Sequence, residues 1–298
     1  MPTSIVDAHH HLWDLGANYY PWLSDVPETN FFLGDYGPLK RNYMPADFRA
    51  DVGDLPVIKT VHCEAEWDRN DQVGETRWLC EVKAQFGMPH AIVAHAWFHT
   101  DDAASALEAQ SQFPLVRGIR SKPVTSLRPD ESVEGQARSM SDPRWREGFA
   151  RLADYGFSWD LRVPYWHLHE AAELVAQHPE IPVVLNHTGF PWDRSERGIV
   201  AWGKAMQTIA QCPNVSLKVS EFGLKDAPWD YDSNARVVHD AIDIFGIERC
   251  MFASNFPVAG LRIDYRTLVS KLERMLSGLT QKEMQAFFHD NAARFYRL

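Results

Sequence analysis

Residues 5–14 read IVDAHHHLWD, and this stretch determines the interpretation of the whole chain. The apolar pair Ile5 and Val6 predicts that a β-strand runs through residues 5–11. Because a strand points alternate side chains to one face, we expect His9 and His11 to point the same way at its end. Two imidazoles side by side on a rigid element form half of a metal site. The alternative, a polar tail that holds three histidines by chance, does not explain the apolar lead-in.

Outward from this stretch, apolar runs of strand type alternate with amphipathic runs of helix type along the chain. The predicted strands cover residues 5–11, 57–65, 90–98, 116–122, 158–164, 183–189, 215–223 and 249–257. Eight such repeats predict an α/β fold, a closed parallel (β/α)8 TIM barrel. A doubly wound open sheet is the alternative, but the glycine-rich phosphate turn that it should carry after the first strand is absent from the sequence.

Two long insertions interrupt the alternation, one after the first predicted strand and one after the fourth. The first covers residues 12–56 and is rich in aromatic side chains, and the second covers residues 123–143. Both leave from the carboxyl ends of strands, so we expect both to lie over the same mouth of the barrel as lids or specificity walls. Some of the aromatic rings in the first insertion are expected simply to pack together beneath the loop.

Composition limits the class of protein. The 298 residues are 45% hydrophobic and 23% charged, which predicts a single folded domain over 1–298. A formal net charge of −10 argues against nucleic acid or an anionic membrane as the partner, and no apolar run is long enough to span a bilayer. The scattered residues Cys63, Cys80, Cys212 and Cys250 predict free thiols in a cytoplasmic protein without a signal peptide. A small-molecule substrate is expected, and a homo-oligomer remains open.

Polar side chains gather at the carboxyl ends of the predicted strands, although the inward face of a barrel is normally apolar. We therefore predict a catalytic mouth there. Its candidate residues are His62 and Glu64 at the end of the second strand, Trp97, Arg120, Arg162, His187, Lys218 and Asn255. His62 and Glu64 are expected to share one face, and His187 is expected to share a face with Val183 and Leu185. Asp160 and Arg162 could form an internal ion pair without a chemical role.

Several of these segments together resemble the amidohydrolase superfamily, in particular the branch that includes sugar-lactone and pyrone-dicarboxylate lactonases. The likeness rests on DAHHHLWD at 7–14, YPWL at 20–23, YMPADF at 43–48, VRGIR at 116–120, VVLNHTG at 183–189, SNFPV at 254–258 and NAARFYRL at 291–298. The resemblance implies a (β/α)8 barrel. It also implies that His9, His11 and His187 match histidines that hold one divalent metal ion, with zinc as the first choice. Some lactonases of this branch resemble a metal-free type, so a site without metal is the alternative.

The chain departs from the family pattern at the eighth strand. Asn255 stands where the family usually carries an aspartate that acts as a general base, and an asparagine has no carboxylate that can take a proton. The missing base must come from elsewhere. Glu64 is our first candidate because it shares the predicted mouth, and His62 is the second.

These observations predict a hydrolase that opens a small carboxylated or hydroxylated lactone by attack of water on the ring carbonyl. His187 and Asn255 would take part in the chemistry with Glu64. Trp97, His62, Arg120, Arg162 and Lys218 would bind the substrate, and arginine suits a bidentate grip on a carboxylate. The alternatives are a metal-dependent non-oxidative decarboxylase and a binding protein that has lost turnover.

Overall fold

The computed structural model describes residues 2–298 as eight parallel strands in one sheet, ordered β1 to β8 along the chain. The strands are Ile5–His10, Val57–Cys63, Ala91–Ala94, Val116–Ile119, Ser158–Leu161, Val183–Leu185, Val215–Val219 and Cys250–Phe252. Backbone hydrogen bonds from His11 N to Phe256 O (2.8 Å) and from Asn255 N to His9 O (2.8 Å) connect the end of β8 back to β1. The predicted TIM barrel is therefore confirmed.

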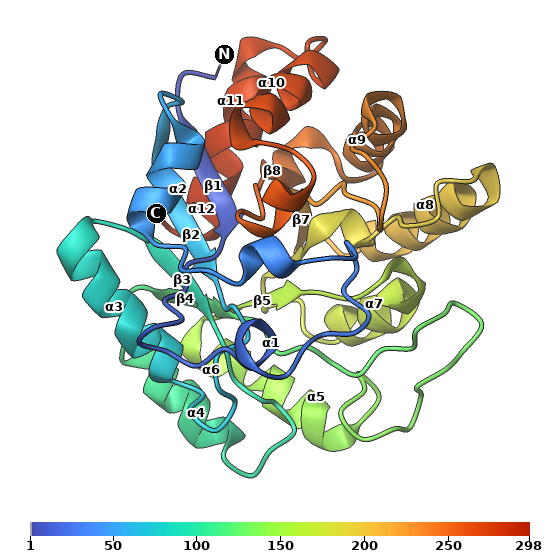
Figure 1. Cartoon of the computed structure of the whole chain (residues 1–298). Helices are drawn as coiled ribbons and strands as arrows, with labels where there is room; N and C mark the ends of the chain where they lie inside the picture. Colours follow the sequence, from blue (N-terminus) through green and yellow to red (C-terminus); the bar gives the residue numbers. More distant parts are fainter. Residues whose placement is uncertain (1) are drawn as a thin grey trace.

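Helices surround the strands, as Figure 1 shows. They are α1 Pro21–Ser24, α2 Pro45–Val52, α3 Gly74–Phe86, α4 Ala103–Ser111, α5 Pro143–Ala150, α6 Leu152–Tyr155, α7 Leu168–Ala176, α8 Glu196–Ala210, α9 Tyr231–Phe245, α10 Tyr265–Met275, α11 Gln281–Gln285 and α12 Asn291–Phe295. The α5 start follows from its sequence: Asp142 accepts a hydrogen bond from Arg144 N, and Pro143 occupies the first turn, where its missing N–H costs nothing.

All eight predicted strands exist, but most are shorter than their apolar runs. The run 90–98 contains β3 only at Ala91–Ala94, and the run 215–223 contains β7 only at Val215–Val219. The residues beyond each strand end leave the sheet and bend over the carboxyl end of the barrel. Those bent segments carry most of the polar candidates.

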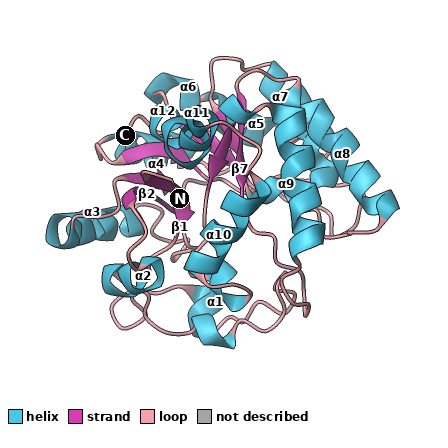
Figure 2. Ribbon diagram, turned by 90° about the horizontal axis from the view of Figure 1, so that it is seen from above, coloured by secondary structure: helices cyan, strands magenta, loops and turns pink. Residues whose placement is uncertain are grey.

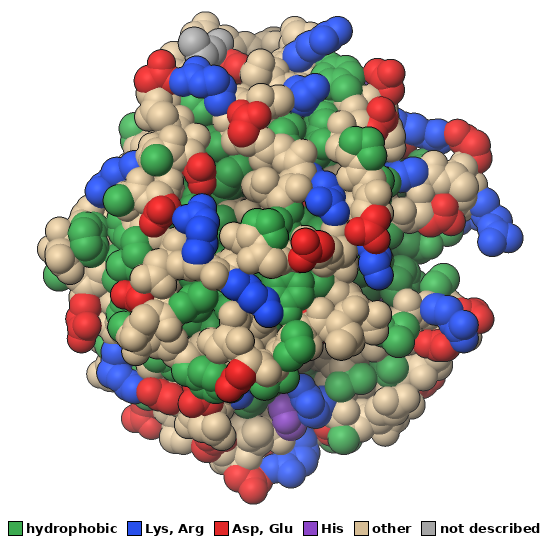
Figure 3. Space-filling model, viewed as in Figure 1, with side chains coloured by type: hydrophobic (Ala, Val, Ile, Leu, Met, Phe, Trp, Pro, Cys, Tyr) green, Lys and Arg blue, Asp and Glu red, His purple; other side chains and the backbone are tan. Residues whose placement is uncertain are grey.

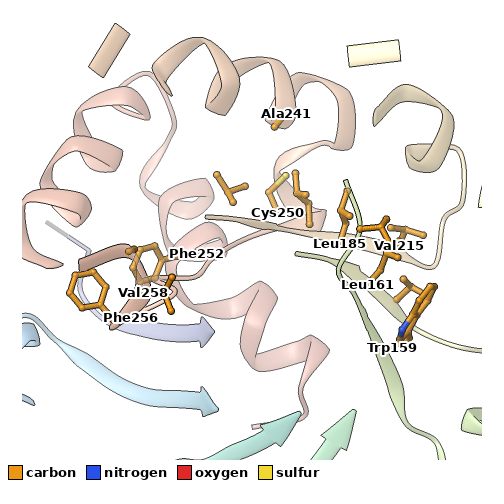
Figure 4. Close-up of a cluster of buried hydrophobic side chains, with 14 of the residues drawn as sticks. Trp159, Leu161, Leu185, Val215, Ala241, Cys250, Phe252, Phe256 and Val258 are labelled. Carbon is orange, nitrogen blue, oxygen red and sulfur yellow. The ribbon is translucent and has the colours of Figure 1, made fainter. Parts of the chain in front are cut away.

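Two apolar layers hold the barrel. Inside it, Val61, Val93, Val184 and Met251 pack with Tyr296 from the end of the chain. Outside it, larger side chains fill the space between the sheet and the helices, and Figure 4 shows part of this layer, with Leu161, Leu185 and Val215 on the strands and Ala241 on α9. Strands buried on both faces have near-continuous apolar sequences, which explains why the runs were easy to recognise.

The two insertions lie over the carboxyl end of the barrel, as predicted. The first, which includes α1, lies in front of the strands in Figure 1 and at the lower edge of Figure 2. It is tied down by Trp22 Nε1, which donates to Ala65 O at 2.9 Å. The second is irregular and is held where Ser126 N donates to His167 Nε2 at 2.9 Å.

The surface carries mixed charges, and lysine, arginine, aspartate and glutamate side chains alternate over the face in Figure 3. No helix within residues 2–298 combines the length and the apolar character needed to cross a membrane. The four cysteines are free, as expected from their scattered positions.

Candidate active site

An irregularity in β1 aims two histidines at the mouth of the barrel. The register between β1 and β2 slips by one residue before His10. Such a bulge shifts the alternation of side chains by one position. Ala8 lies in the interior core, and its neighbour His9 also points inward to meet His11, whereas His10 packs outward against Phe48. The predicted common direction of His9 and His11 is therefore observed, and the bulge turns it toward the barrel interior.

His9, His11 and His187 form a buried cluster of imidazoles. The Nε2 atoms of His9 and His11 are 3.3 Å apart, and the ring centroids of His9 and His187 are 4.6 Å apart. His11 Nδ1 lies 2.7 Å from Cys63 O, and His187 Nδ1 lies 3.0 Å from Ser220 Oγ. Burial is the main cause that lowers the pKa of all three rings well below the usual value. The cluster is therefore neutral at pH 7.

A backbone turn, not strand alternation, brings His187 into this cluster. Val184 faces the barrel interior, while Val183 and Leu185 pack on the helix side, so the face predicted for this strand is wrong. His187 would continue the outward face, but its φ of 58° lies in the left-handed region and turns the side chain inward.

The ends of β7 and β8 meet at a hydrogen-bonded pair, Glu221 and Asn255. Asn255 Nδ2 donates to Glu221 Oε2, and Asn255 Oδ1 lies 3.2 Å from Nε2 of His11. Both residues have a left-handed φ, 52° for Glu221 and 57° for Asn255. Such backbone costs free energy in residues other than glycine, and its occurrence at three positions of this mouth, His187 included, is typical of functional sites.

Lys218 lies deep in the barrel and forms a fully buried ion pair with Asp160, beneath His9. Its Nζ is also 3.3 Å from Nδ1 of His9. Asp160 accepts further hydrogen bonds from Asn186 Nδ2 at 3.0 Å and from the hydroxyl of Tyr296 at 3.2 and 3.1 Å. The internal partner of Asp160 is thus Lys218 and not Arg162 as the sequence suggested.

Glu64 lies at the mouth and is held by cations. Arg120 Nε donates to Glu64 Oε1 at 2.7 Å, and Arg69 Nη2 donates to Oε2 at 2.9 Å. Burial alone would raise the pKa of Glu64, but the charges of Arg69 and Arg120 outweigh it and hold that pKa well below the usual value. Glu64 is therefore ionised and weakly basic, an arrangement that suits an anchor for Arg120 better than a proton acceptor. Its predicted role as the base stays a prediction.

His62 and Trp97 lie away from the imidazole cluster, in different directions. His62 points out of the barrel, where its Nε2 is 3.2 Å from Glu75 Oε1, so it does not share a face with Glu64. Trp97 is partly buried between two guanidinium groups, with Arg69 Cζ 5.3 Å and Arg138 Cζ 4.8 Å from its ring centroid. Arg138 belongs to the second insertion, so Trp97 attaches that loop to the rim.

Arg162 offers the mouth an unpaired positive charge. Its guanidinium stacks near Phe190 and Phe32, with Cζ 5.0 and 5.9 Å from their ring centroids. Within residues 2–298 it forms no hydrogen bond or ion pair, although burial lowers its pKa only to about 10. Its charge also contributes to the low pKa of His187. A charged group of this kind, half-buried and unpartnered, is available to a ligand.

His9 and His11 are spaced for a single divalent ion, but no nitrogen of His187 lies within 4.8 Å of both, so His187 must move inward to complete such a site. Bonds of about 2.0–2.1 Å to zinc in tetrahedral geometry place two nitrogens about 3.3 Å apart, which is the separation of Nε2 in His9 and His11. His11 Nδ1 contacts a carbonyl oxygen and therefore carries the proton, which leaves the lone pair on Nε2 available to a metal. Nε2 of His187 forms no hydrogen bond to described residues. Lys218, however, contacts Nδ1 of His9 and favours the proton on Nε2, so metal binding requires this contact to change.

A second group of candidate ligands lies one layer deeper. It consists of three potential ligand atoms that lie within 4.8 Å of one another, one each from His9, Cys63 and Asp160. Lys218 contacts two of these residues, so its ammonium already supplies positive charge to the group. This layer is therefore the weaker candidate for a metal.

Sequence reasoning missed Glu221 and Tyr296. Strand alternation places Glu221 opposite Lys218 and Ser220, and only its left-handed φ brings it to the mouth. Tyr296 reaches the barrel interior from the far end of the chain, where periodicity carries no information about distant contacts. The run of polar residues after Val219 was the signal that could have identified Glu221.

Comparisons with known proteins agree with this geometry. The family model described as amidohydrolase matches residues 6–298. An uncharacterized protein, y4mH of Sinorhizobium fredii, is 39% identical over 99% of both chains. The L-fucono-1,5-lactonase of Burkholderia multivorans is 26% identical over 98% of this chain and 96% of that protein. The crystal structure of a B. multivorans amidohydrolase with bound zinc superposes with a TM-score of 0.81, at 24% identity, over 99% of this chain and all of that one (100%).

Proposed function

Because the chain belongs to the amidohydrolase family, we propose that it is a hydrolase that opens a small lactone by adding water across the ring ester. The observation that carries this proposal is the buried cluster of neutral imidazoles beside an unpaired arginine at the barrel mouth. Sugar lactones are the first substrates to consider, since the related B. multivorans enzyme is an L-fucono-1,5-lactonase. A lactone carbonyl is more reactive than an amide, so it requires less stabilisation of the transition state.

Arg162 is the proposed contact for a carboxylate or hydroxyl group on the substrate. The parallel N–H groups of its guanidinium can donate to two oxygens of the substrate at once. The rings of Phe32 and Phe190 provide an apolar surface against which the lactone ring would pack. Arg120 points to the same mouth, and Glu64 keeps it oriented. These contacts favour a substrate with a small ring and at least one anionic or hydroxyl substituent.

A positive charge held at the imidazole cluster would stabilise the negative charge that develops on the ring carbonyl oxygen when water attacks, because the neutral rings supply no such charge themselves. His9, His11 and His187 would hold one divalent ion, which we propose to be zinc, and such an ion polarises a carbonyl or lowers the pKa of bound water. Lys218 and Asp160 fix His9 from below, and Ser220 orients His187. The residues thus position the reacting groups in a dry, rigid environment.

The test combines turnover with metal analysis on the purified chain. L-Fucono-1,5-lactone, other sugar lactones and 2-pyrone-4,6-dicarboxylic acid are followed by NMR for ring opening and for released carbon dioxide. We expect ring opening without loss of carbon, and about one zinc per chain that is absent from His11→Gln. His169→Gln is the matched control, because His169 lies exposed on α7.

Carbon dioxide release without ring opening would favour the decarboxylase alternative. No turnover of any lactone, with ligand binding retained, would favour a binding protein. Full activity without bound metal would support the metal-free form of the lactonase.

A further inference from the structure

Glu221 is a buried carboxylate at the mouth that no cationic side chain of residues 2–298 contacts directly. It follows β7 and is 5% exposed. Oε2 accepts a hydrogen bond from Asn255 Nδ2, and Oε1 accepts one from Gly223 N at 3.3 Å. Arg162 and Arg262 face it at longer range, from the segments that follow β5 and β8. A carboxylate with two such contacts keeps lone pairs for another donor.

Asn255 connects this carboxylate to the imidazole cluster. One end of its side-chain amide bonds to Glu221, and the other end, Oδ1, lies 3.2 Å from Nε2 of His11. The amide is therefore fixed in one orientation, with its oxygen directed at the cluster. Asn255 Oδ1 has two lone pairs and can therefore accept a hydrogen bond from a water at the mouth.

The two carboxylates of the mouth have opposite environments. Arg69 and Arg120 hold Glu64 in its ionised form. Burial instead raises the pKa of Glu221 to about 7, although the hydrogen bonds from Asn255 and Gly223 lower it in part. In active sites, groups whose surroundings separate their pKa values in this way divide the acid–base roles between them. The group that titrates near neutrality is the one able to accept and return a proton.

We propose that Glu221 is the general base of this site and removes a proton from the water that Asn255 orients. This inference rests on the proposed lactone hydrolysis. The water oxygen forms a bond to the ring carbonyl carbon while one of its protons moves to the carboxylate of Glu221. The ring C–O bond then breaks, and Glu221 returns that proton to the departing ring oxygen, so one water is added in total.

This role predicts a specific pH dependence. A base must be unprotonated to act, so kcat/KM rises through an apparent pKa of about 7 and levels off above it. Arg162 and Arg262 both favour the ionised form, so a bound anionic substrate that pairs with Arg162 raises the pKa of Glu221 and shifts the midpoint of kcat upward, while that of kcat/KM reports the free enzyme.

Hydrolysis of L-fucono-1,5-lactone, corrected for spontaneous opening, tests the proposal between pH 5.5 and 8.5. Glu221→Gln keeps the shape of the side chain, and we expect it to lower kcat/KM by about 10²–10⁴-fold and to remove the rise near pH 7. Glu221→Asp is expected to retain the rise with reduced kcat. Glu108→Gln, which replaces an exposed glutamate on α4, is the matched control.

A double variant tests whether this pair needs one carboxylate. Glu221→Gln combined with Asn255→Asp exchanges the carboxylate and the amide across the same hydrogen bond, and we expect it to recover at least tenfold over Glu221→Gln alone. Because Asn255→Asp also restores the carboxylate that the family usually carries, the pH profile of Glu221→Gln alone is the readout that separates catalysis from structure. Circular dichroism of every variant checks that the fold is intact.

The outcomes distinguish this inference from the proposed function. If the wild-type chain hydrolyses the lactone and Glu221→Gln keeps the rise near pH 7, or loses less than tenfold in kcat/KM, Glu221 is not the base although the function stands. If the wild type opens no lactone in the panel, the proposed function fails and the inference fails with it.

Discussion

Replacing Asp160 by asparagine should destabilise the protein strongly, because it leaves the ammonium of Lys218 without a counter-charge inside the barrel. Both side chains are 0% exposed. Removal of one partner of a buried pair costs about 3–5 kcal/mol, since the remaining charge stays desolvated. For a chain of this size, each kcal/mol corresponds to about 2 °C in Tm, so Asp160→Asn should melt roughly 6–10 °C lower.

Urea unfolding at pH 7, followed by tryptophan fluorescence, measures the effect as a free energy of unfolding. Combining Asp160→Asn with Lys218→Met removes both charges and should recover most of the loss, because an apolar replacement of a buried pair is often neutral. Glu196→Gln is the control. It breaks the exposed pair with Arg236, where the side chains are 79% and 43% accessible, and should leave the free energy of unfolding almost unchanged, because solvent screens this pair.

The reasoning is refuted if Asp160→Asn loses less than about 1 kcal/mol, the cost of an exposed pair. It is also refuted if the double variant is no more stable than the single one. Either result would mean that water or a shifted backbone solvates the Lys218 ammonium in the protein.

Three further predictions follow from the site. Glu64→Gln should release Arg120 and depress hydrolysis strongly while circular dichroism stays unchanged, and near-full activity would exclude Glu64 from the chemistry. Arg162→Met should raise KM for a carboxylated lactone about 10–100-fold, the equivalent of a charged hydrogen bond, with a much smaller change for an uncharged lactone; equal changes would contradict the assignment. Burial raises the pKa of Glu75 to about 8, so the folded state retains a proton that the unfolded state loses above pH 4.5, and the contribution of Glu75 to stability should fall as the pH rises between those values. The urea midpoint of the wild type relative to that of Glu75→Gln should therefore be lower at pH 8 than at pH 5, and an unchanged difference would place the proton elsewhere.

The sequence was sufficient to predict the barrel because each strand is buried on both faces. Runs such as Val183–Leu185 are apolar throughout, so they are recognisable even where only three residues join the sheet. Burial on both faces also means that the sequence does not show which side chains of a strand face the barrel interior. With apolar residues on both sides, nothing in that run indicates that Val184 lines the interior.

The candidate site was predicted less completely, because strand periodicity fails where the backbone departs from strand geometry. The bulge in β1 and the left-handed turns at His187 and Glu221 re-aim side chains by one position. Residue chemistry still identified the imidazoles and arginines. It could not predict that Glu64 would be enclosed by cations or that Glu221 would remain without one, since both facts depend on contacts between distant segments.

The contact between Tyr296 and Asp160 has a consequence for how the chain is made. A ribosome adds about 5–20 residues per second and releases the amino-terminal segments first. The hydroxyl that completes the ring of donors around Asp160 is 136 positions downstream and lies two residues before Leu298. The earlier strands must therefore wait for this distant residue before the donors around Asp160 are complete, and until then they are held only by their own partial packing.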